Sequence, residues 1–247
     1  MRRSYVKLVN AVQTLFLLFA ISLVLSGCSG TAVNNSVANA SGNSNSNAAN
    51  SNSTVTAAKV TINSPDGVKI VGTYLTASKP NSPAVLLLHQ WQSDRHSYDE
   101  FAKRMHDKGF AVLSIDGRGF GESTRKADGS TVAPGRTDAD VKAMLGDVDA
   151  GFNFLAKQPN VDASKIGIVG ASYGSSLALI YAADHPNVAA VAMLSPGLNY
   201  FGNMPTKPAA AKYGDRELLL FAAKDDKESA DAVSELNPMQ VDNPKYQ

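Results

Sequence analysis

Hydrophobic and polar residues alternate in two different ways along most of this 247-residue chain. From residue 59 onward, short runs of apolar and β-branched residues are separated by longer stretches with helical spacing of their apolar residues. Because this alternation is typical of β-α-β units, it predicts an α/β fold with a mostly parallel sheet flanked by helices. The expected strands cover residues 59–63, 69–77, 84–89, 110–115, 166–169, 188–194 and 217–222, the first two forming a hairpin.

The expected helices fill the intervals between these strands. Ser97 and Glu100 have the Ser-x-x-Glu spacing of a capping box, so we expect a helix to begin at Ser97 and to end at Gly109. A second long helix is expected over residues 141–157. The continuous apolar run at residues 84–89 predicts a central strand that is buried on both faces.

The first 27 residues have the pattern of a targeting signal. An apolar stretch at residues 15–25 follows a basic start and precedes Leu25, Ser26, Gly27 and Cys28. The stretch is shorter than the roughly 20 residues that span a bilayer, which argues against the alternative of an uncleaved transmembrane anchor. The pattern resembles a bacterial lipoprotein signal. It implies cleavage after residue 27, lipidation of Cys28, and membrane attachment outside the cytoplasm, at the outer membrane or cell surface.

The next segment is of low complexity. Residues 30–57 contain no charged and no aromatic residue and are mostly Ser, Asn and Ala. Such a segment buries too little apolar surface to offset its chain entropy, so residues 28–57 are interpreted as a flexible tether. Residues 58–247 are then the single folded domain, and with 44% hydrophobic residues in the whole chain it can form one sizeable core.

Charge and cysteine content narrow the function classes. The chain has 23 Lys and Arg residues, and without Arg2, Arg3 and Lys7 of the signal there remain 20 against 22 Asp and Glu. This balance gives no support for a nucleic-acid partner. The single cysteine excludes an internal disulfide, and no His, Cys and carboxylate cluster has metal-ligand spacing, so neither a metal nor another cofactor is expected.

Residues 170–174 form the clearest candidate for chemistry. They read Gly-Ala-Ser-Tyr-Gly, between an apolar run at 166–169 and a helical pattern at 175–183. A Gly-x-Ser-x-Gly pentad on a strand-to-helix turn is typical of a nucleophile elbow, in which the glycines let the backbone close without Cβ clashes. The sequence therefore indicates Ser172 as a nucleophile; a glycine-rich turn with a buried serine is the alternative.

Four motifs together resemble the α/β-hydrolases, close to the dienelactone-hydrolase and acyl-peptidase-like serine esterases, over residues 55–247. One is the elbow, and a second is His89, Gln90 and Trp91, where the family has His-Gly-x. The third is the run 116–123, similar to the Asp-x-Arg-Gly-x-Gly-x-Ser loop of the family, which is expected to be structural. The fourth is the pair Asp225 and Asp226, at the position of the family's acid.

The resemblance implies a role for each residue in the cleavage of a small ester or related acyl substrate, with a peptide as the alternative. Ser172 attacks the carbonyl and forms an acyl-enzyme. The backbone N–H groups of Tyr173 and Trp91 hold the oxyanion, although Trp91 could instead be a core anchor. Asp226 is the expected acid because of its spacing to Ser229. Asp225 is one alternative, and a helix-capping role for both is another.

The histidine of a Ser-Asp-His triad is missing, since none of the four histidines follows Asp226. His185 is expected at the far end of the helix after the elbow, roughly 18 Å from Ser172. His89 is expected to brace the oxyanion loop, and His96 and His106 to lie in a loop and on a helix surface. We therefore expect a C-terminally incomplete hydrolase, lacking its last strand and helix.

Two consequences follow from such an incomplete chain. Activity of this chain should be weakened, and residues 217–222 should form an apolar open edge of the sheet. The alternative is a non-catalytic surface lipoprotein that uses the hydrolase fold as a binding module.

Overall fold

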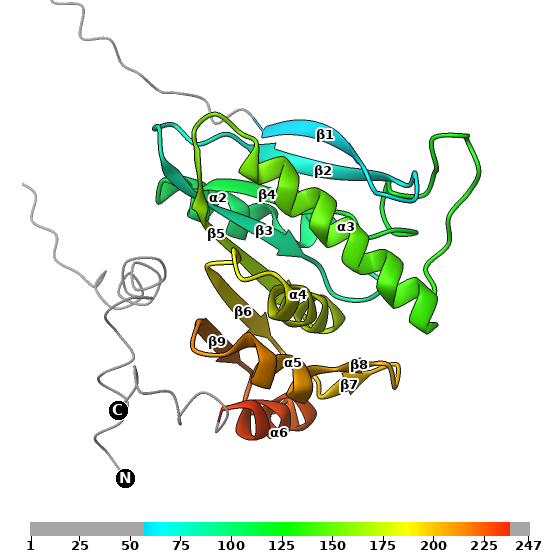
Figure 1. The fold of residues 1–247 in the computed structure, drawn as a ribbon, viewed down its shortest axis with the longest axis vertical. Helices are drawn as coiled ribbons and strands as arrows, with labels where there is room; N and C mark the ends of the chain where they lie inside the picture. Colours follow the sequence, from blue (N-terminus) through cyan, green and yellow to red (C-terminus); the bar gives the residue numbers. More distant parts are fainter. Residues whose placement is uncertain (1–56, 238–247) are drawn as a thin grey trace, which may run out of the picture. The chain divides into compact units, whose positions relative to one another are not determined.

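The central feature of the fold is a seven-stranded sheet in a computed structural model that describes residues 57–237. The strand order is β1-β2-β4-β3-β5-β6-β9, antiparallel from β1 to β4 and parallel from β4 to β9 (Figure 1). The predicted α/β fold is therefore confirmed. The strands are β1 (Ala57–Asn63), β2 (Lys69–Leu75), β3 (Ser82–Leu88), β4 (Ala111–Ile115), β5 (Val161–Ala171), β6 (Ala190–Leu194) and β9 (Glu217–Phe221).

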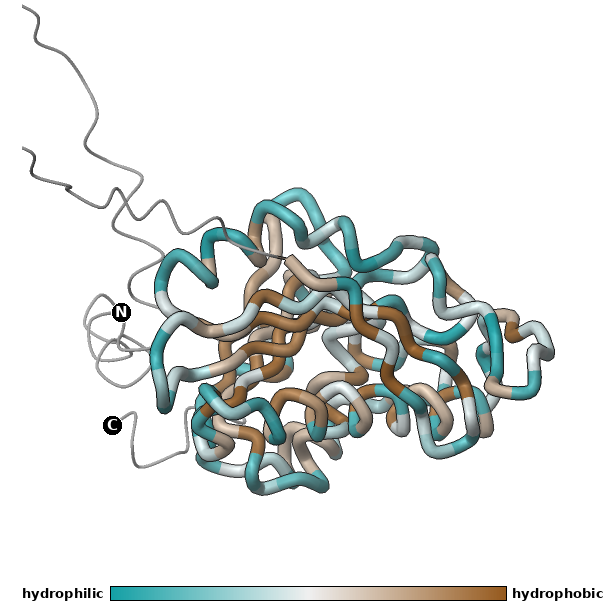
Figure 2. The backbone as a smooth tube through the Cα atoms, turned by 90° about the horizontal axis from the view of Figure 1, so that it is seen from above, coloured by the Kyte–Doolittle hydropathy of each residue, from teal (hydrophilic) through white to brown (hydrophobic). Residues whose placement is uncertain are grey.

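Helices cover both faces of this sheet. Helices α3 (Asp138–Ala156) and α4 (Tyr173–Asp184) pack side by side in front of it, whereas α2 (Asp99–Asp107) lies behind β4 (Figure 1). Helix α5 (Thr206–Tyr213) packs against α4, and α6 (Lys227–Leu236) follows β9. Figure 2 shows the resulting distribution of hydropathy, with hydrophobic strands inside and hydrophilic loops around them.

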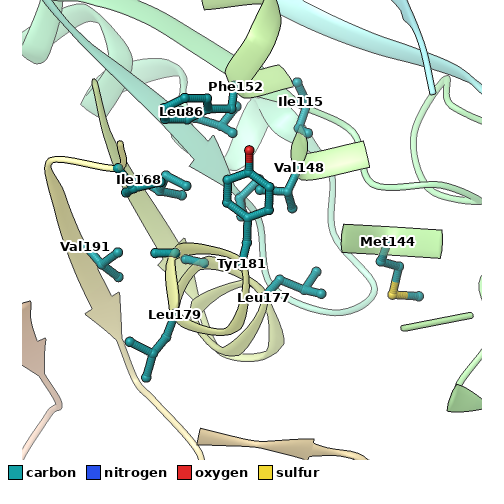
Figure 3. Close-up of a cluster of buried hydrophobic side chains, with 14 of the residues drawn as sticks. Leu86, Ile115, Met144, Val148, Phe152, Ile168, Leu177, Leu179, Tyr181 and Val191 are labelled. Carbon is teal, nitrogen blue, oxygen red and sulfur yellow. The ribbon is translucent and has the colours of Figure 1, made fainter. Parts of the chain in front are cut away.

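The main core lies between the sheet and helices α3 and α4. Leu86 and Ile168 project from neighbouring strands toward Phe152 of α3 and Leu177 of α4 (Figure 3). The Phe152 side chain is 1% exposed, so its contacts are almost entirely with other apolar groups. Burial of such a side chain stabilises the fold by about 1.5–3 kcal/mol relative to exposure, and this core holds the carboxyl ends of the strands in place.

One predicted helix start is wrong. The chain enters helical geometry in a short 3₁₀ helix, η1 (Arg95–Tyr98), and α2 begins at Asp99 without a side-chain cap. The Asp94 carboxylate accepts a hydrogen bond from the His96 amide at 2.9 Å, and the Ser97 hydroxyl donates to the Asp94 carbonyl at 2.8 Å. Asp94 thus caps the helical segment earlier in the chain than the predicted box of Ser97 and Glu100.

The segment between β6 and β9 contains structure that the sequence pattern did not predict. Strands β7 (Asn199–Tyr200) and β8 (Met204–Pro205) form a small separate hairpin, and α5 follows directly. Strands of two residues are too short to show any periodicity, which explains why they were missed. This hairpin lies near the start of α3 and contributes residues to the candidate site.

Strand β9 is the outermost strand of the sheet within the described residues. It pairs with β6, and residues 57–237 place no strand on its other side. The Phe221 side chain is 62% exposed there. Within residues 57–237, β9 is thus at the edge of the sheet, and an apolar open edge of the whole protein stays a prediction.

Candidate active site

Ser172 occupies a strained turn between β5 and α4. Its backbone has φ 51° and ψ −123°, a conformation that residues with a Cβ rarely adopt and that costs on the order of 1–3 kcal/mol. A Cβ on Gly170 would lie 2.2 Å from the Gly174 carbonyl oxygen, and one on Gly174 would lie 2.6 Å from the His89 carbonyl oxygen. Both glycines are therefore required by close backbone contacts, and the predicted elbow geometry is present.

Two backbone amides of the elbow and of the loop after β3 have no acceptor among the described residues. Within residues 57–237 no acceptor is found for the amide of Tyr173, the first residue of α4, or for that of Trp91. The loop that carries Trp91 reaches the elbow, since a Cβ on Gly174 would contact the Leu88 and His89 carbonyls. Unpaired N–H groups of this kind stabilise negative charge on a substrate oxygen.

The Trp91 side chain belongs to an aromatic cluster over the elbow. Its ring centroid lies 5.3 Å from that of Tyr173, 4.9 Å from Phe120 and 4.7 Å from Phe201. The indole is half-buried and packs against the main core. The Trp91 side chain is thus an anchor for the core and forms part of the site wall, whereas the oxyanion role of its amide stays a prediction.

The two candidate acids differ in their surroundings. Asp226 is the N-cap of α6 and accepts a hydrogen bond from the Ser229 amide at 3.2 Å. Hydrogen bonds from the Ser229 hydroxyl, the largest cause, from its amide, and from the Ser195 hydroxyl hold the pKa of Asp226 below its ordinary value. Asp225 is exposed. The capping role expected as an alternative is present for Asp226, which also interacts with Ser195 at the end of β6, and its role as the acid stays a prediction.

A segment at the end of β6 links Asp226 to the elbow. The Ser172 amide donates to the Leu194 carbonyl at 2.9 Å, and the Ser195 amide donates to the Phe221 carbonyl at 2.7 Å. Ser195 has φ 47°, so this segment turns sharply as it leaves the sheet. Ser172 and Asp226 therefore contact adjacent residues, Leu194 and Ser195.

Tyr200 is a site residue that the sequence did not reveal. Its hydroxyl donates to the Ser195 carbonyl at 3.2 Å. Burial is the largest cause that raises the pKa of Tyr200, and the Asp226 and Glu228 charges act in the same direction, whereas a hydrogen bond with the Ser172 side chain lowers it. The phenol is thus neutral at neutral pH and lies beside the Ser172 hydroxyl.

His89 does not contact Ser172. Its Nδ1 lies 2.7 Å from the Gln90 carbonyl oxygen, and its Nε2 accepts a hydrogen bond from the Gly117 amide at 2.9 Å. Burial lowers the pKa of His89, which favours this neutral form. Because both ring nitrogens are engaged, His89 braces the loop after β3 as predicted and has no nitrogen free for the Ser172 proton.

The other three histidines bond to groups other than Ser172: His185 at the far end of α4 and His106 on α2, as predicted, and His96 in η1, where a loop was expected. His185 is the C-cap of α4, where Nδ1 is 2.6 Å from the Tyr181 carbonyl oxygen. His96 pairs with Asp99 on the surface, and His106 of α2 contacts the Thr76 carbonyl. The sequence has four histidines, and none of them reaches Ser172.

The loop at residues 116–123 is structural, as expected. The fully buried Asp116 carboxylate accepts from the amides of Arg95 and Glu122, both at 2.8 Å. Arg118 binds a different carboxylate, that of Asp147, at 2.7 and 2.8 Å. Each charge is thus neutralised by its own partners, and the two residues do not form a reacting pair.

Other sequence predictions concern metals and the N-terminal segment. Within residues 57–237, no group of His, Cys, Asp and Glu is arranged to hold a metal ion, and no helix is long and apolar enough to cross a membrane. The predicted signal peptide, the tether and Cys28 lie outside the described residues.

Comparisons with known structures agree with this architecture. An esterase of Pyrococcus furiosus superposes with a TM-score of 0.62 at 18% identity, covering 76% of this chain and 77% of that chain. A dienelactone hydrolase of Anabaena variabilis superposes with a TM-score of 0.57 at 19% identity, covering 74% of this chain and 81% of that chain. At these identities the likeness shows a shared fold.

Sequence comparisons identify two uncharacterised relatives. They also identify the family of this chain. An uncharacterised protein of Mycobacterium tuberculosis is 30% identical over 133 residues, which are 53% of this chain and 43% of that protein. An uncharacterised protein of Rickettsia prowazekii is 28% identical over 147 residues, which are 57% of this chain and 56% of that protein. The chain thus spans about half the length of these curated relatives. The model of the serine aminopeptidase S33 family matches residues 79–224, more than half of the chain, and the chain therefore belongs to this family of the α/β-hydrolase superfamily.

Proposed function

We propose that this protein is a serine hydrolase that cleaves carboxylic esters or related acyl compounds through an acyl-enzyme on Ser172. One observation carries the proposal. Ser172 is held in a strained elbow, next to the Tyr173 amide and packed against the loop that carries Trp91, and residues 57–237 provide no acceptor for either amide. Strain of this kind persists where the surrounding structure enforces it, and it is concentrated at functional sites.

The proposed reaction uses these groups in order. The Ser172 Oγ forms a bond to the acyl carbonyl carbon while the carbonyl π electrons move to oxygen, where the Tyr173 and Trp91 amides bind the oxyanion. Collapse of this intermediate expels the alcohol, which takes up a proton, and leaves the acyl group on Ser172. Water then adds to the acyl-enzyme and releases the carboxylic acid.

The proton of Ser172 limits the rate in this chain. No histidine reaches Ser172, and the neighbouring Tyr200 phenol is a poor base because it is neutral. The proton is therefore transferred to solvent. In serine hydrolases, loss of a triad member leaves about 10³–10⁴-fold acceleration over the uncatalysed reaction. We expect weak turnover, supported by the oxyanion site alone.

Covalent labelling tests the nucleophile directly. The protein is incubated with an alkyl fluorophosphonate, and the modified peptide is identified by mass spectrometry. Slow modification at Ser172 is expected, and it should disappear in Ser172→Ala but persist in Ser234→Ala, an exposed serine of α6. Absence of labelling at Ser172 in the folded protein would contradict the proposal.

Turnover distinguishes ester from peptide cleavage. Hydrolysis of p-nitrophenyl butyrate is compared with that of an amino-acid p-nitroanilide, in the wild-type chain and in Ser172→Ala. We expect ester hydrolysis above the Ser172→Ala background and little release of p-nitroaniline. Turnover as fast as that of a complete triad enzyme would refute the reasoning about the missing base.

A second candidate function follows from the histidines. Because none of them contacts Ser172, the fold could serve as a non-catalytic binding module of a surface lipoprotein. This candidate predicts ligand binding with neither labelling nor turnover. It would replace the first proposal if both of the tests above were negative.

The cellular location is also a proposal. The basic start, the apolar stretch at 15–25 and Cys28 support attachment to the cell envelope through a lipid on Cys28. In bacteria grown with labelled palmitate, label should enter the protein, and Cys28→Ser should abolish it and release the protein from the membrane fraction. An unlabelled but membrane-bound Cys28→Ser protein would instead favour the uncleaved anchor.

A further inference from the structure

Arg136 lies directly before α3 and contacts the aromatic cluster over the elbow. Its guanidinium carbon is 4.8 Å from the centroid of the Trp91 ring and 4.8 Å from that of Phe201. These rings are in contact with each other and, through Tyr173, with the elbow. Contact with ring faces leaves the N–H edge of a guanidinium available for another partner.

The backbone around Arg136 is fixed from two sides. The Asn203 side chain, in the turn between β7 and β8, donates to the Arg136 carbonyl at 2.9 Å and to the Asp138 carboxylate at 3.0 Å. Thr137 and Asp140 form a capping box at the start of α3. The arginine is thus anchored where α3 and the β7–β8 hairpin come together (Figure 1).

The charge of Arg136 is not neutralised by a carboxylate in the described part of the chain. Arg95 and Arg118, by contrast, each pair with two carboxylates. The acidic residues nearest to Arg136 in sequence are engaged elsewhere, Asp138 with Asn203 and Asp140 with Thr137. A positioned and unpaired guanidinium beside the Trp91 loop therefore has capacity for an anionic ligand.

We propose that Arg136 binds a carboxylate on the acyl part of the substrate, so that the preferred substrates are monoesters of short dicarboxylic acids. The inference rests on the proposed function, because it assumes that an acyl carbonyl occupies the space between Ser172 and the Trp91 amide. A guanidinium binds a carboxylate through two parallel N–H···O bonds, which selects for the anion over a neutral chain end. Trp91 then contacts both ends of the acyl group, with its amide at the carbonyl and its ring beside Arg136.

The single tryptophan of the chain is Trp91, and it provides a readout that does not depend on turnover. The Ser172→Ala protein, which cannot be acylated at this position, is titrated with monomethyl glutarate and separately with methyl valerate while indole fluorescence is recorded. The two esters are similar in length and differ in charge. We expect about tenfold tighter binding of the anion, as for one charge-assisted interaction at a partly exposed site.

Variants assign the preference to Arg136. In the Ser172→Ala background, Arg136→Gln should bind both esters equally, whereas Arg136→Lys should keep part of the preference for the anion. Arg104→Gln removes an exposed arginine of α2 on the other face of the sheet and should leave the tenfold ratio intact. Equal affinity for both esters with Arg136 present, or a ratio that survives Arg136→Gln, would overturn the inference.

This binding test separates two kinds of failure. If Ser172 is labelled by the fluorophosphonate but Arg136 shows no preference, the hydrolase proposal stands and the carboxylate subsite is refuted. If the preference is found but Ser172 is neither labelled nor active, the subsite stands and belongs to a binding module.

Discussion

The strain at Ser172 predicts that glycine at this position gives a more stable protein than alanine. A non-glycine residue at φ 51° and ψ −123° costs on the order of 1–3 kcal/mol, and glycine adopts this conformation without that cost. Glycine also adds about 0.5–1 kcal/mol of backbone entropy to be lost on folding. The difference leaves about 1 kcal/mol of net stabilisation.

The correct reference for this prediction is Ser172→Ala and not the wild type. Alanine removes the hydroxyl and its contact with Tyr200 but keeps the Cβ that causes the strain. The free energies of unfolding of the alanine and glycine variants are measured by urea denaturation at pH 7. A difference of 1 kcal/mol corresponds to about 2–4 °C in the melting temperature of a domain of this size.

A second serine provides a matched control. Ser176 is buried in the interior of α4, where glycine has no conformational advantage. There Ser176→Gly should be less stable than Ser176→Ala by about 0.5–1 kcal/mol, the reverse of the order at Ser172. If glycine is also the less stable variant at position 172, the backbone is not strained there and the elbow argument fails.

Three further predictions concern the core, the buried ion pair and pH. Phe152→Ala should lower the free energy of unfolding by about 3–5 kcal/mol in urea denaturation, because it opens a cavity in the core; a loss below about 1 kcal/mol would contradict the packing described. Arg118→Met should lower the free energy of unfolding at pH 7 by about 3–5 kcal/mol, because the Asp147 carboxylate stays buried after its closest cation is removed. Urea denaturation measures this loss, and an unchanged free energy of unfolding would contradict the prediction. The pKa of Asp226 is depressed in the folded state from about 3.8, so its contribution to stability is present above that pH and is lost as pH falls through the lower folded value. The stability difference between wild type and Asp226→Asn should therefore shrink on acidification, and a difference that grows below pH 4 would contradict the assigned hydrogen bonds.

Local patterns were sufficient to predict the seven strands of the main sheet and the elbow. The conformations of the β3 strand and of the pentad around Ser172 can be predicted from their own residues, because the apolar run and the glycines are close together in the sequence. The role of His89 was also predictable, since it directly follows β3 and bonds to the next residue in sequence. Such features can be predicted without knowing how distant parts of the chain pack.

Contacts between distant segments were not predictable in the same way. The preference of Asp94 over Ser97 as a cap depends on how the chain leaves β3 and turns toward η1. Tyr200 reaches Ser172 because the β7–β8 hairpin brings it back over the end of β6. A two-residue strand has no pattern that would have indicated this hairpin.

The candidate site therefore consists of two parts with different origins. The oxyanion side is local, because Ser172 and Tyr173 are consecutive and Trp91 follows the adjacent strand β3. The other side depends on the β6–β9 region, where Ser195, Tyr200 and Asp226 are connected by hydrogen bonds and charge. An imidazole between Asp226 and Ser172 would complete a proton path, and none of the four histidines of the chain lies there. Within the described residues the oxyanion side is thus the better defined of the two parts, and labelling and fluorescence are the first tests because neither requires turnover.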